Sequence, residues 1–100
     1  MPQITIVYWR DIPAQVIAKA GRTTAKRVLN ERFEKAIDRA AMRANLRDTD
    51  SYLAEWRRAD PVECGTDLEA EAAAVAARLE AEFPEERLAQ FVMAGGKTPT

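Results

Sequence analysis

Gln3-Ile-Thr-Ile-Val-Tyr-Trp9 and Ala14-Gln-Val-Ile-Ala-Lys-Ala20 are the two stretches that decide the fold of this chain. The first is rich in β-branched and aromatic residues, which predicts a strand. The second is bounded by Pro13 and Gly21, and its short length favours a strand over the helix that its composition also allows. Because the connection between the two stretches is short, we expect the strands to pair in an antiparallel arrangement.

Two helices with the same spacing of apolar residues are predicted further along the chain. The first is expected to begin at Thr23 or Thr24, whose hydroxyl can cap a helix, and to run to about Leu46. The second opens with Thr66-Asp-Leu-Glu69, a capping box in which the first and last residues bond each other's backbone N–H. The apolar stripes predict that the two helices pack side by side on one sheet face. The stripes comprise Leu29, Phe33, Ala36, Ile37, Ala40 and Ala44 in the first helix, and Leu68, Ala72, Val75, Ala76, Leu79 and Phe83 in the second.

A third strand is expected between the two helices, from Tyr52 to Arg58, after the polar break Arg47-Asp-Thr-Asp50. A right-handed connection would place it parallel to the second strand, with the first strand between them. A short helix from Glu85 to Met93 follows, and Gly95-Gly96 ends it.

The sequence thus predicts an α+β fold of order β-β-α-β-α. We expect a small, mostly antiparallel three-stranded sheet, two long helices packed on one face and a short C-terminal helix. Residues 1–94 are expected to form a single domain, and residues 95–100 a flexible tail.

The composition argues against several classes of catalytic site. The chain has 100 residues, no histidine and a single cysteine, Cys64, which is expected to be an inert thiol. It therefore has no Ser-His-Asp or Cys-His arrangement and no zinc site of ordinary composition. No Walker loop or dinucleotide-binding glycine motif occurs. We predict no catalytic residue, no metal and no cofactor, and we leave open only a reaction that uses carboxylates and arginines alone.

The charges are divided unevenly along the chain. Residues 1–60 carry 12 Lys or Arg and 8 Asp or Glu, a net charge of +4, whereas residues 61–100 carry 3 and 8, a net charge of −5. The basic part could face an anion and the acidic part a basic partner, or the two parts could simply attract each other or face solvent. Neither a secretory signal nor a membrane-spanning run is visible, which favours a cytoplasmic location and no membrane contact.

The best candidate for a ligand site is Gly21-Arg-Thr-Thr-Ala-Lys-Arg27, where a glycine leads from a strand into the predicted helix N-terminus. Free backbone N–H groups, two hydroxyls and three cationic side chains would together form a seat for a phosphate or another small anion. The alternative is an ordinary capped helix followed by solvated basic residues. The candidate residues are Arg10, Lys19, Gly21, Arg22, Thr23, Thr24, Lys26 and Arg27.

A second set of residues is a candidate protein interface. Lys35, Arg39 and Arg43 step by four along one helix face, and Arg47 is the next residue at that spacing. Like charges so placed repel by about 0.2–0.5 kcal/mol per pair, so the row either has a partner or is a solvated face. Aromatic residues gather at the strand ends, where Trp9 precedes Arg10 and Trp56 precedes Arg57; exposed, they would anchor an interface, and buried, they would belong to the core.

Several of these segments resemble the bacterial virulence factor domain family. The resemblance extends over roughly residues 3–80 as a hydrophobic and charge pattern rather than a chemical signature. The residues that carry it are Ile4-Thr-Ile-Val-Tyr-Trp-Arg-Asp-Ile-Pro13, Ala14-Gln-Val-Ile17, Arg22, Lys26, Arg32-Phe33, Ala36-Ile37-Asp38 and Tyr52-Leu-Ala-Glu-Trp56.

The resemblance implies an accessory or scaffold role and no catalytic residues. In this family the domain occurs alone and also inside a larger protein, beside a NifU-type scaffold domain and helical repeats. Stand-alone members look like companions of bacterial methyl-transfer systems that use folate and corrinoid proteins. No residue of this chain matches a corrinoid-ligating motif.

Three functions are therefore weighed from the sequence. The leading hypothesis is a non-enzymatic accessory module that binds a protein partner or a second copy of itself. The second is a domain that binds a small anionic ligand at Gly21 to Arg27. The third is weak nucleic-acid binding, which the net charge of −1 disfavours.

Overall fold

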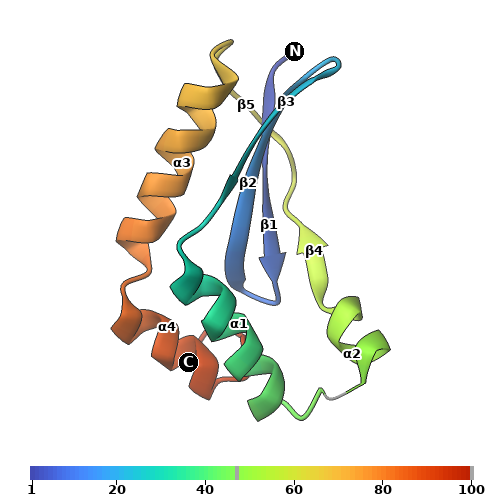
Figure 1. Cartoon of the computed structure of the whole chain (residues 1–100), viewed down its shortest axis with the longest axis vertical. Helices are drawn as coiled ribbons and strands as arrows, with labels where there is room; N and C mark the ends of the chain where they lie inside the picture. The colour runs from blue at the N-terminus through green and yellow to red at the C-terminus, as the bar shows by residue number, and fades with distance from the viewer. Residues whose placement is uncertain (47, 100) are drawn as a thin grey trace.

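The computed structural model describes residues 1–46 and 48–99 of the chain. Arg47, which the sequence places in a polar break, and Thr100, at the end of the predicted tail, lie outside the described residues. Figure 1 shows a long, twisted sheet with one helix along its side and further helices at its lower end. The elements in chain order are β1 (Gln3–Trp9), β2 (Ile12–Ala20), β3 (Thr23–Val28), α1 (Glu31–Arg43), α2 (Thr49–Ala54), β4 (Trp56–Arg58), β5 (Val62–Glu63), α3 (Leu68–Glu82) and α4 (Glu85–Met93).

The sheet is built around the β1–β2 hairpin, as the sequence predicts. Trp9 of β1 pairs with Ile12 of β2, so the two-residue turn Arg10-Asp11 joins them and β2 begins before its predicted start. β4 pairs antiparallel with β1 and therefore runs parallel to β2. This confirms the predicted position of the first strand between its two neighbours.

The sheet has five strands within the described residues, where the sequence predicts three. Its order is β3-β2-β1-β4, with β5 also pairing with β1, and every pairing is antiparallel. The α+β class is confirmed. The predicted order β-β-α-β-α is wrong, because a third strand precedes the first helix and a short helix precedes β4.

The segment predicted to begin the first helix is instead the strand β3. Gly21 has a φ of 59° and takes the first position of a two-residue hairpin turn, a position where glycine is favoured because the backbone is left-handed. The turn brings Ala25 opposite Ala18, and both alanines are buried. The predicted helix start at Thr23 or Thr24 is therefore wrong. The helix α1 begins at Glu31 behind Asn30, whose Oδ1 accepts a 3.1 Å hydrogen bond from the Arg32 N–H.

The segment predicted as a third strand is divided between a helix and a strand. Asp48 caps α2, and its carboxylate accepts a 3.1 Å hydrogen bond from the backbone N–H of Ser51. The first part of Tyr52 to Arg58 is therefore helical, and only Trp56 to Arg58 pairs with β1. A local cap outweighs the alternating pattern here, because the alternation spans too few residues to specify a strand by itself.

The cap of α3 differs from the predicted capping box by one residue. Asp67 rather than Thr66 occupies the N-cap, and its Oδ1 accepts a 3.2 Å hydrogen bond from the Ala70 N–H. Both residue types cap helices well, so the sequence alone does not separate the two positions. The apolar stripe is confirmed, since Leu68 and four further residues are buried; the other four are Ala72, Ala76, Leu79 and Phe83.

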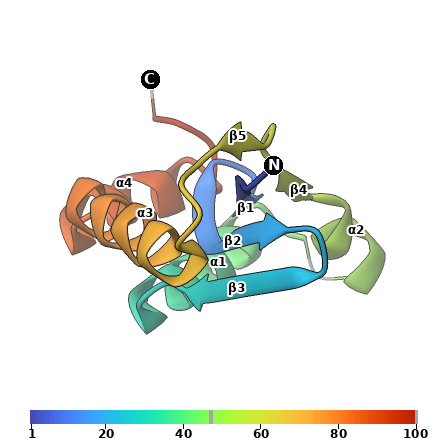
Figure 2. The ribbon, with the colours of Figure 1, turned by 90° about the horizontal axis from the view of Figure 1, so that it is seen from above.

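The two long helices do not lie side by side on the sheet, which corrects the predicted packing. α3 packs along β2 and β3, whereas α1 packs mainly against α4 and also contacts β2. Arg32, in the first turn of α1, donates a 2.7 Å hydrogen bond to the carbonyl of Glu80 near the end of α3. The start of α1 thus meets the end of α3. Figure 2 shows α3 beside β2 and β3, with α2 beyond the opposite edge of the sheet.

The residues after α4 return to the β1–β2 turn. Gly96 donates a 2.8 Å hydrogen bond to the Phe91 carbonyl, and its own carbonyl accepts a 2.9 Å hydrogen bond from the Asp11 N–H. The backbone N–H and hydroxyl of Thr98 donate to the Asp11 carboxylate at 2.7 and 3.0 Å. The sequence predicts a flexible tail from residue 95; in the structure the chain is hydrogen-bonded to the turn as far as Thr98.

Within residues 1–46 and 48–99, none of the helices combines the length and the apolar character that crossing a bilayer requires.

Candidate functional site

The sequence leaves open whether Trp9 and Arg10 are exposed or belong to the core, and the structure places both in the interior. Trp9 is fully buried, and its Nε1 donates a 3.0 Å hydrogen bond to the Tyr52 carbonyl. Arg10 donates from Nη2 to the Glu55 carboxylate and from Nη1 to the Gly95 carbonyl, each at 3.0 Å. Trp9 therefore cannot anchor an interface. Arg10 joins the turn to α2 and to the C-terminal segment.

Arg10 also lies far from the other residues of the predicted anion site. It stands at one end of the β1–β2 hairpin, whereas Gly21 is at the opposite end of β2. Nine residues of strand at about 3.4 Å each separate them by about 30 Å. The structure therefore does not bring Arg10 to the candidate residues at Gly21 to Arg27.

The remaining residues of that candidate site are divided between the two faces of the β2–β3 hairpin. Lys19 pairs with Thr24, and Lys26 pairs with Ile17, so both lysines lie on the face opposite α3. Thr23 and Arg27 lie on the face that also carries the buried alanines beneath α3. Gly21 and Arg22 form the exposed turn. Since the segment is a strand, it offers no helix N-terminus, and the anion site remains a prediction that rests on side chains alone.

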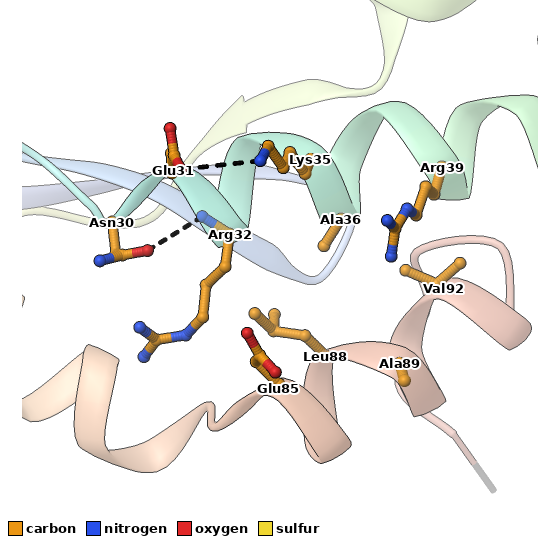
Figure 3. Close-up of a pocket in the computed structure, with 10 residues that line it drawn as sticks. All are labelled: Asn30, Glu31, Arg32, Lys35, Ala36, Arg39, Glu85, Leu88, Ala89 and Val92. Carbon is orange, nitrogen blue, oxygen red and sulfur yellow. Dashed lines mark hydrogen bonds and ion pairs between the residues drawn. The ribbon is translucent and has the colours of Figure 1, made fainter.

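A groove between α1 and α4 collects part of the predicted basic row. It has a volume of about 480 Å³ and lies where the two helices pack together. Figure 3 shows Ala36 on α1 facing Leu88, Ala89 and Val92 on α4, which together form an apolar floor. In the same view Arg39 extends from α1 toward α4.

The basic side chains beside this groove differ in the hydrogen bonds and ion pairs that they form. Lys35 forms a 3.6 Å ion pair with Glu31, and Arg43 donates a 3.1 Å hydrogen bond to the Met93 carbonyl. Among the described residues, Arg39 makes neither a hydrogen bond nor an ion pair. Lys35 and Arg39 line the groove directly, as a shared interface surface would require, while Arg43 stands at the next turn of α1.

A second cavity, which we call the Trp56 hollow, is one that the sequence does not predict. Its volume is about 320 Å³, and it lies between α1, α2 and the β2–β3 strands. Two aromatic rings, two carboxylates and four aliphatic side chains face it, together with Gln15. They are Tyr52 and Trp56, Glu34 and Asp38, and Ala14, Val28, Leu29 and Ile37. The sequence does show Tyr52 and Trp56 as aromatic residues close together. Glu34 and Asp38 on α1 belong to no motif that would place them beside these two rings.

Arg57, predicted as an interface residue next to Trp56, is bonded to the β1–β2 turn, while about half of its side chain stays exposed. Its Nη2 forms a 3.1 Å ion pair with Asp11, and its Nε donates a 2.9 Å hydrogen bond to the Arg10 carbonyl. Its guanidinium also lies 4.6 Å from the centre of the Tyr8 ring. Of the two aromatic strand ends, Trp56 is half-buried and reaches the surface, and Trp9 does not.

Cys64 has the environment of an unreactive thiol. Partial burial and then the nearby carboxylate of Glu71 raise the pKa of the Cys64 thiol above its ordinary value. A thiol with a raised pKa holds less of the nucleophilic thiolate at neutral pH. Among the described residues, no group of three or more acidic or cysteine side chains is placed to bind a metal ion.

Comparison with known proteins identifies one family. No curated protein and no solved structure matches the chain. The family described as "Virulence factor" matches residues 7–92, from the end of β1 to the end of α4. This range exceeds half of the chain and contains both the α1–α4 groove and the Trp56 hollow. The chain therefore belongs to the virulence factor family.

Proposed function

We propose that this domain is a non-enzymatic accessory module that docks a protein partner in the groove between α1 and α4. The observation that carries the proposal is an apolar floor bordered by an unpaired arginine. Ala36 and Ala89 leave space between the helices, while Arg39 stands at the edge without a partner among the described residues. Arginine and packed apolar side chains are the groups that dominate the energy of protein interfaces.

The partner we expect is a helix or an acidic surface element. A groove between two helices accepts a third helix through its apolar face, as in other helix-in-groove complexes. Carboxylates on the partner would pair with Arg39 and Lys35, and they would replace the exposed Glu31–Lys35 pair, which contributes little in water. Exposed Met42 and Met93 lie on the same two helices and extend the apolar area available to a partner.

The family supports a companion role for the module. Stand-alone members resemble companions of bacterial methyl-transfer systems that use folate and corrinoid proteins. On this basis we propose that the partner is a protein of such a system, and that the domain contributes binding rather than chemistry. The same groove could alternatively hold a second copy of the chain, which a measurement of mass in solution distinguishes.

The test compares two double variants that change net charge equally. Lys35→Glu with Arg39→Glu alters the groove, and Lys19→Glu with Lys26→Glu alters the opposite part of the molecule. Purified corrinoid and methyltransferase proteins from a host that carries this chain are titrated by calorimetry at low salt. We expect the groove variant to weaken binding at least tenfold and the control to bind like the wild-type chain.

Three results would contradict the proposal. The first is that the wild-type chain binds none of these proteins and does not self-associate in sedimentation. The second is that both double variants lose binding equally. Salt-dependent binding to mixed-sequence oligonucleotides with no protein partner would favour the nucleic-acid alternative instead.

A further inference from the structure

We propose that the Trp56 hollow binds an organic cation, with an alkylated ammonium group held between two aromatic rings and two carboxylates. This ligand site is separate from the α1–α4 groove, since the two share no lining residue. It adds a small-ligand or side-chain recognition function to the docking role proposed above.

The aromatic part of the hollow consists of two rings at nearly right angles. The centres of the Tyr52 and Trp56 rings are 6.2 Å apart, and their planes meet at 83°. Trp9 supports this arrangement from the interior, because its ring stacks on Tyr52 at 5.7 Å and its Nε1 bonds the Tyr52 carbonyl. Both residues line the hollow, so a cation in it would lie beside two aromatic rings, each of which attracts positive charge.

The charged part of the hollow comes from α1. Glu34 and Asp38 stand four residues apart on the helix, both side chains are exposed, and both line the hollow. Among the described residues neither carboxylate makes an ion pair or a hydrogen bond. Two like charges at this spacing repel each other modestly. A cation bound between α1 and the aromatic rings would remove that repulsion.

The electrostatic effect of these carboxylates already reaches the aromatic rings. Burial, followed by the negative charge of Asp38 and more weakly that of Glu34, raises the pKa of the Tyr52 hydroxyl. The negative potential at Asp38 and Glu34 therefore extends to the ring that a ligand would contact. This agrees with the geometry, in which the carboxylates and rings line the same cavity.

The remaining lining residues select the class of cation. Val28, Leu29 and Ile37 give the hollow aliphatic surface, and Val28 is 69% exposed. On this side of the hollow a strongly hydrated inorganic ion or a bare ammonium would lose water that aliphatic carbon cannot replace, although the carboxylates on the other side could hold it. Methyl groups on the nitrogen spread the charge and contact aliphatic carbon, which is the basis of quaternary ammonium recognition by aromatic side chains.

The test uses choline and its uncharged isostere, 3,3-dimethylbutan-1-ol, as probes with the same shape. Each is titrated into the ¹⁵N-labelled chain, and the amide shifts of residues 34–38 and the two indole N–H signals are followed. We expect saturable shifts with choline and at least tenfold weaker binding of the isostere. Choline should move the Trp56 indole signal more than the Trp9 signal, because Trp9 is fully buried.

Variants separate the two parts of the site. Glu34→Gln and Asp38→Asn keep the shape of exposed side chains, so the chain should still fold, and together they should weaken choline binding about tenfold. Trp56→Leu should also weaken it by about tenfold, the order expected for loss of a cation–π contact. Glu86→Gln on α4 removes one carboxylate elsewhere and should leave choline binding unchanged.

A peptide that carries trimethyl-lysine, compared with the same peptide with unmodified lysine, distinguishes a side-chain source from a free small cation. Tighter binding of the methylated peptide than of choline supports a ligand carried by a protein. Equal affinity for the methylated peptide and for choline supports a free small cation. Both results support the site. Equal affinity for choline and its isostere would overturn the proposal, and so would unchanged binding in the Glu34→Gln and Asp38→Asn double variant. Neither result depends on whether the α1–α4 groove binds a protein.

Discussion

Gly96 lies against the indole of Trp9 so closely that a Cβ atom at position 96 would be 2.6 Å from the Cζ3 atom of Trp9. Gly96 also has a φ of 93°, a backbone conformation that side chains disfavour. The close approach is what allows the C-terminal segment to cover the buried tryptophan. Position 96 is therefore restricted to glycine for two separate reasons.

The first prediction concerns the substitution Gly96→Ala. We expect it to lower the free energy of unfolding by about 2–4 kcal/mol, because strain and a steric clash act together. Gly21→Ala is the matched control, since Gly21 also has a positive φ but has no atom near its Cβ position. It should lower the free energy by only about 1–2 kcal/mol. Urea unfolding measures both, and equal losses would contradict the clash with Trp9.

The second prediction concerns the pH dependence of stability at the β1–β2 turn. Burial of Asp11 opposes ionisation, but the two hydrogen bonds from Thr98 and the ion pair with Arg57 outweigh it and hold the pKa of Asp11 below its ordinary 3.8. A carboxylate with a lowered pKa stabilises the folded state above its unfolded pKa and loses this effect as pH falls through the folded value. Asp11→Asn should therefore be less stable than wild type at pH 6, with the difference shrinking below about pH 4.

Thermal unfolding between pH 6 and pH 2.5 measures this difference. Asp60→Asn serves as the control, because Asp60 makes no hydrogen bond or ion pair with the described residues. A difference between wild type and Asp11→Asn that stays constant down to pH 2.5 would contradict the prediction.

The third prediction separates the two possible caps of α3. Asp67→Ala should lower the free energy of unfolding by about 1 kcal/mol, because the Asp67 carboxylate bonds the Ala70 N–H. Thr66→Ala should change it by only a few tenths of that amount, within the range of ordinary surface substitutions. Chemical denaturation of both variants is sufficient, and a larger loss for Thr66→Ala would restore the capping box.

The fourth prediction concerns the reactivity of Cys64. Because its pKa is raised, the thiol should react with iodoacetamide at pH 7.5 more slowly in the folded chain than in the chain unfolded in urea. The ratio of the two rates, followed by mass spectrometry, measures the protection. Faster reaction in the folded state would indicate an activated thiolate and would reopen a catalytic role for Cys64.

The parts of the fold that the sequence predicts correctly are those with a long and repeated pattern. The stripe from Leu68 to Phe83 spans four helical turns, and β1 combines β-branched with aromatic residues over seven positions. A pattern of this length outweighs the preference of any single residue within it for another structure. The hairpin of β1 and β2 is also predicted correctly, but its turn is shorter than expected, because Ile12 pairs with Trp9 and belongs to β2.

The parts that fail are short and carry competing local signals. Thr23 and Thr24 suit both a helix cap and a strand, and the decision lies in the turn at Gly21 and in the burial of Ala25 beneath α3. Asn30, directly before Glu31, is the N-cap of α1. The predicted helix starts at Thr23 or Thr24 and already includes Asn30, so the sequence does not identify Asn30 as a cap. A contact with a distant element thus decides between two local structures that the sequence favours almost equally.

The candidate sites also divide into one that the sequence predicts in part and one that it does not predict. The row Lys35, Arg39 and Arg43 follows from helical spacing alone, and two of its members line the groove. The Trp56 hollow could not be predicted, because it depends on α2 bringing Tyr52 beside the far end of β3 and on α1 presenting Asp38 there. The sequence contains each residue, and only the packing of separate elements places them together.

The contact between Asp11 and Thr98 also has a consequence for the order in which the chain is made. The two residues are 87 positions apart, yet the hydrogen bond between them completes the first turn of the sheet. During translation Asp11 leaves the ribosome before Thr98 is added, so this hydrogen bond cannot form while the first strands are being made. The contact that ties the C-terminal segment to the β1–β2 turn can therefore form only after all the strands and helices between the two residues have been synthesised.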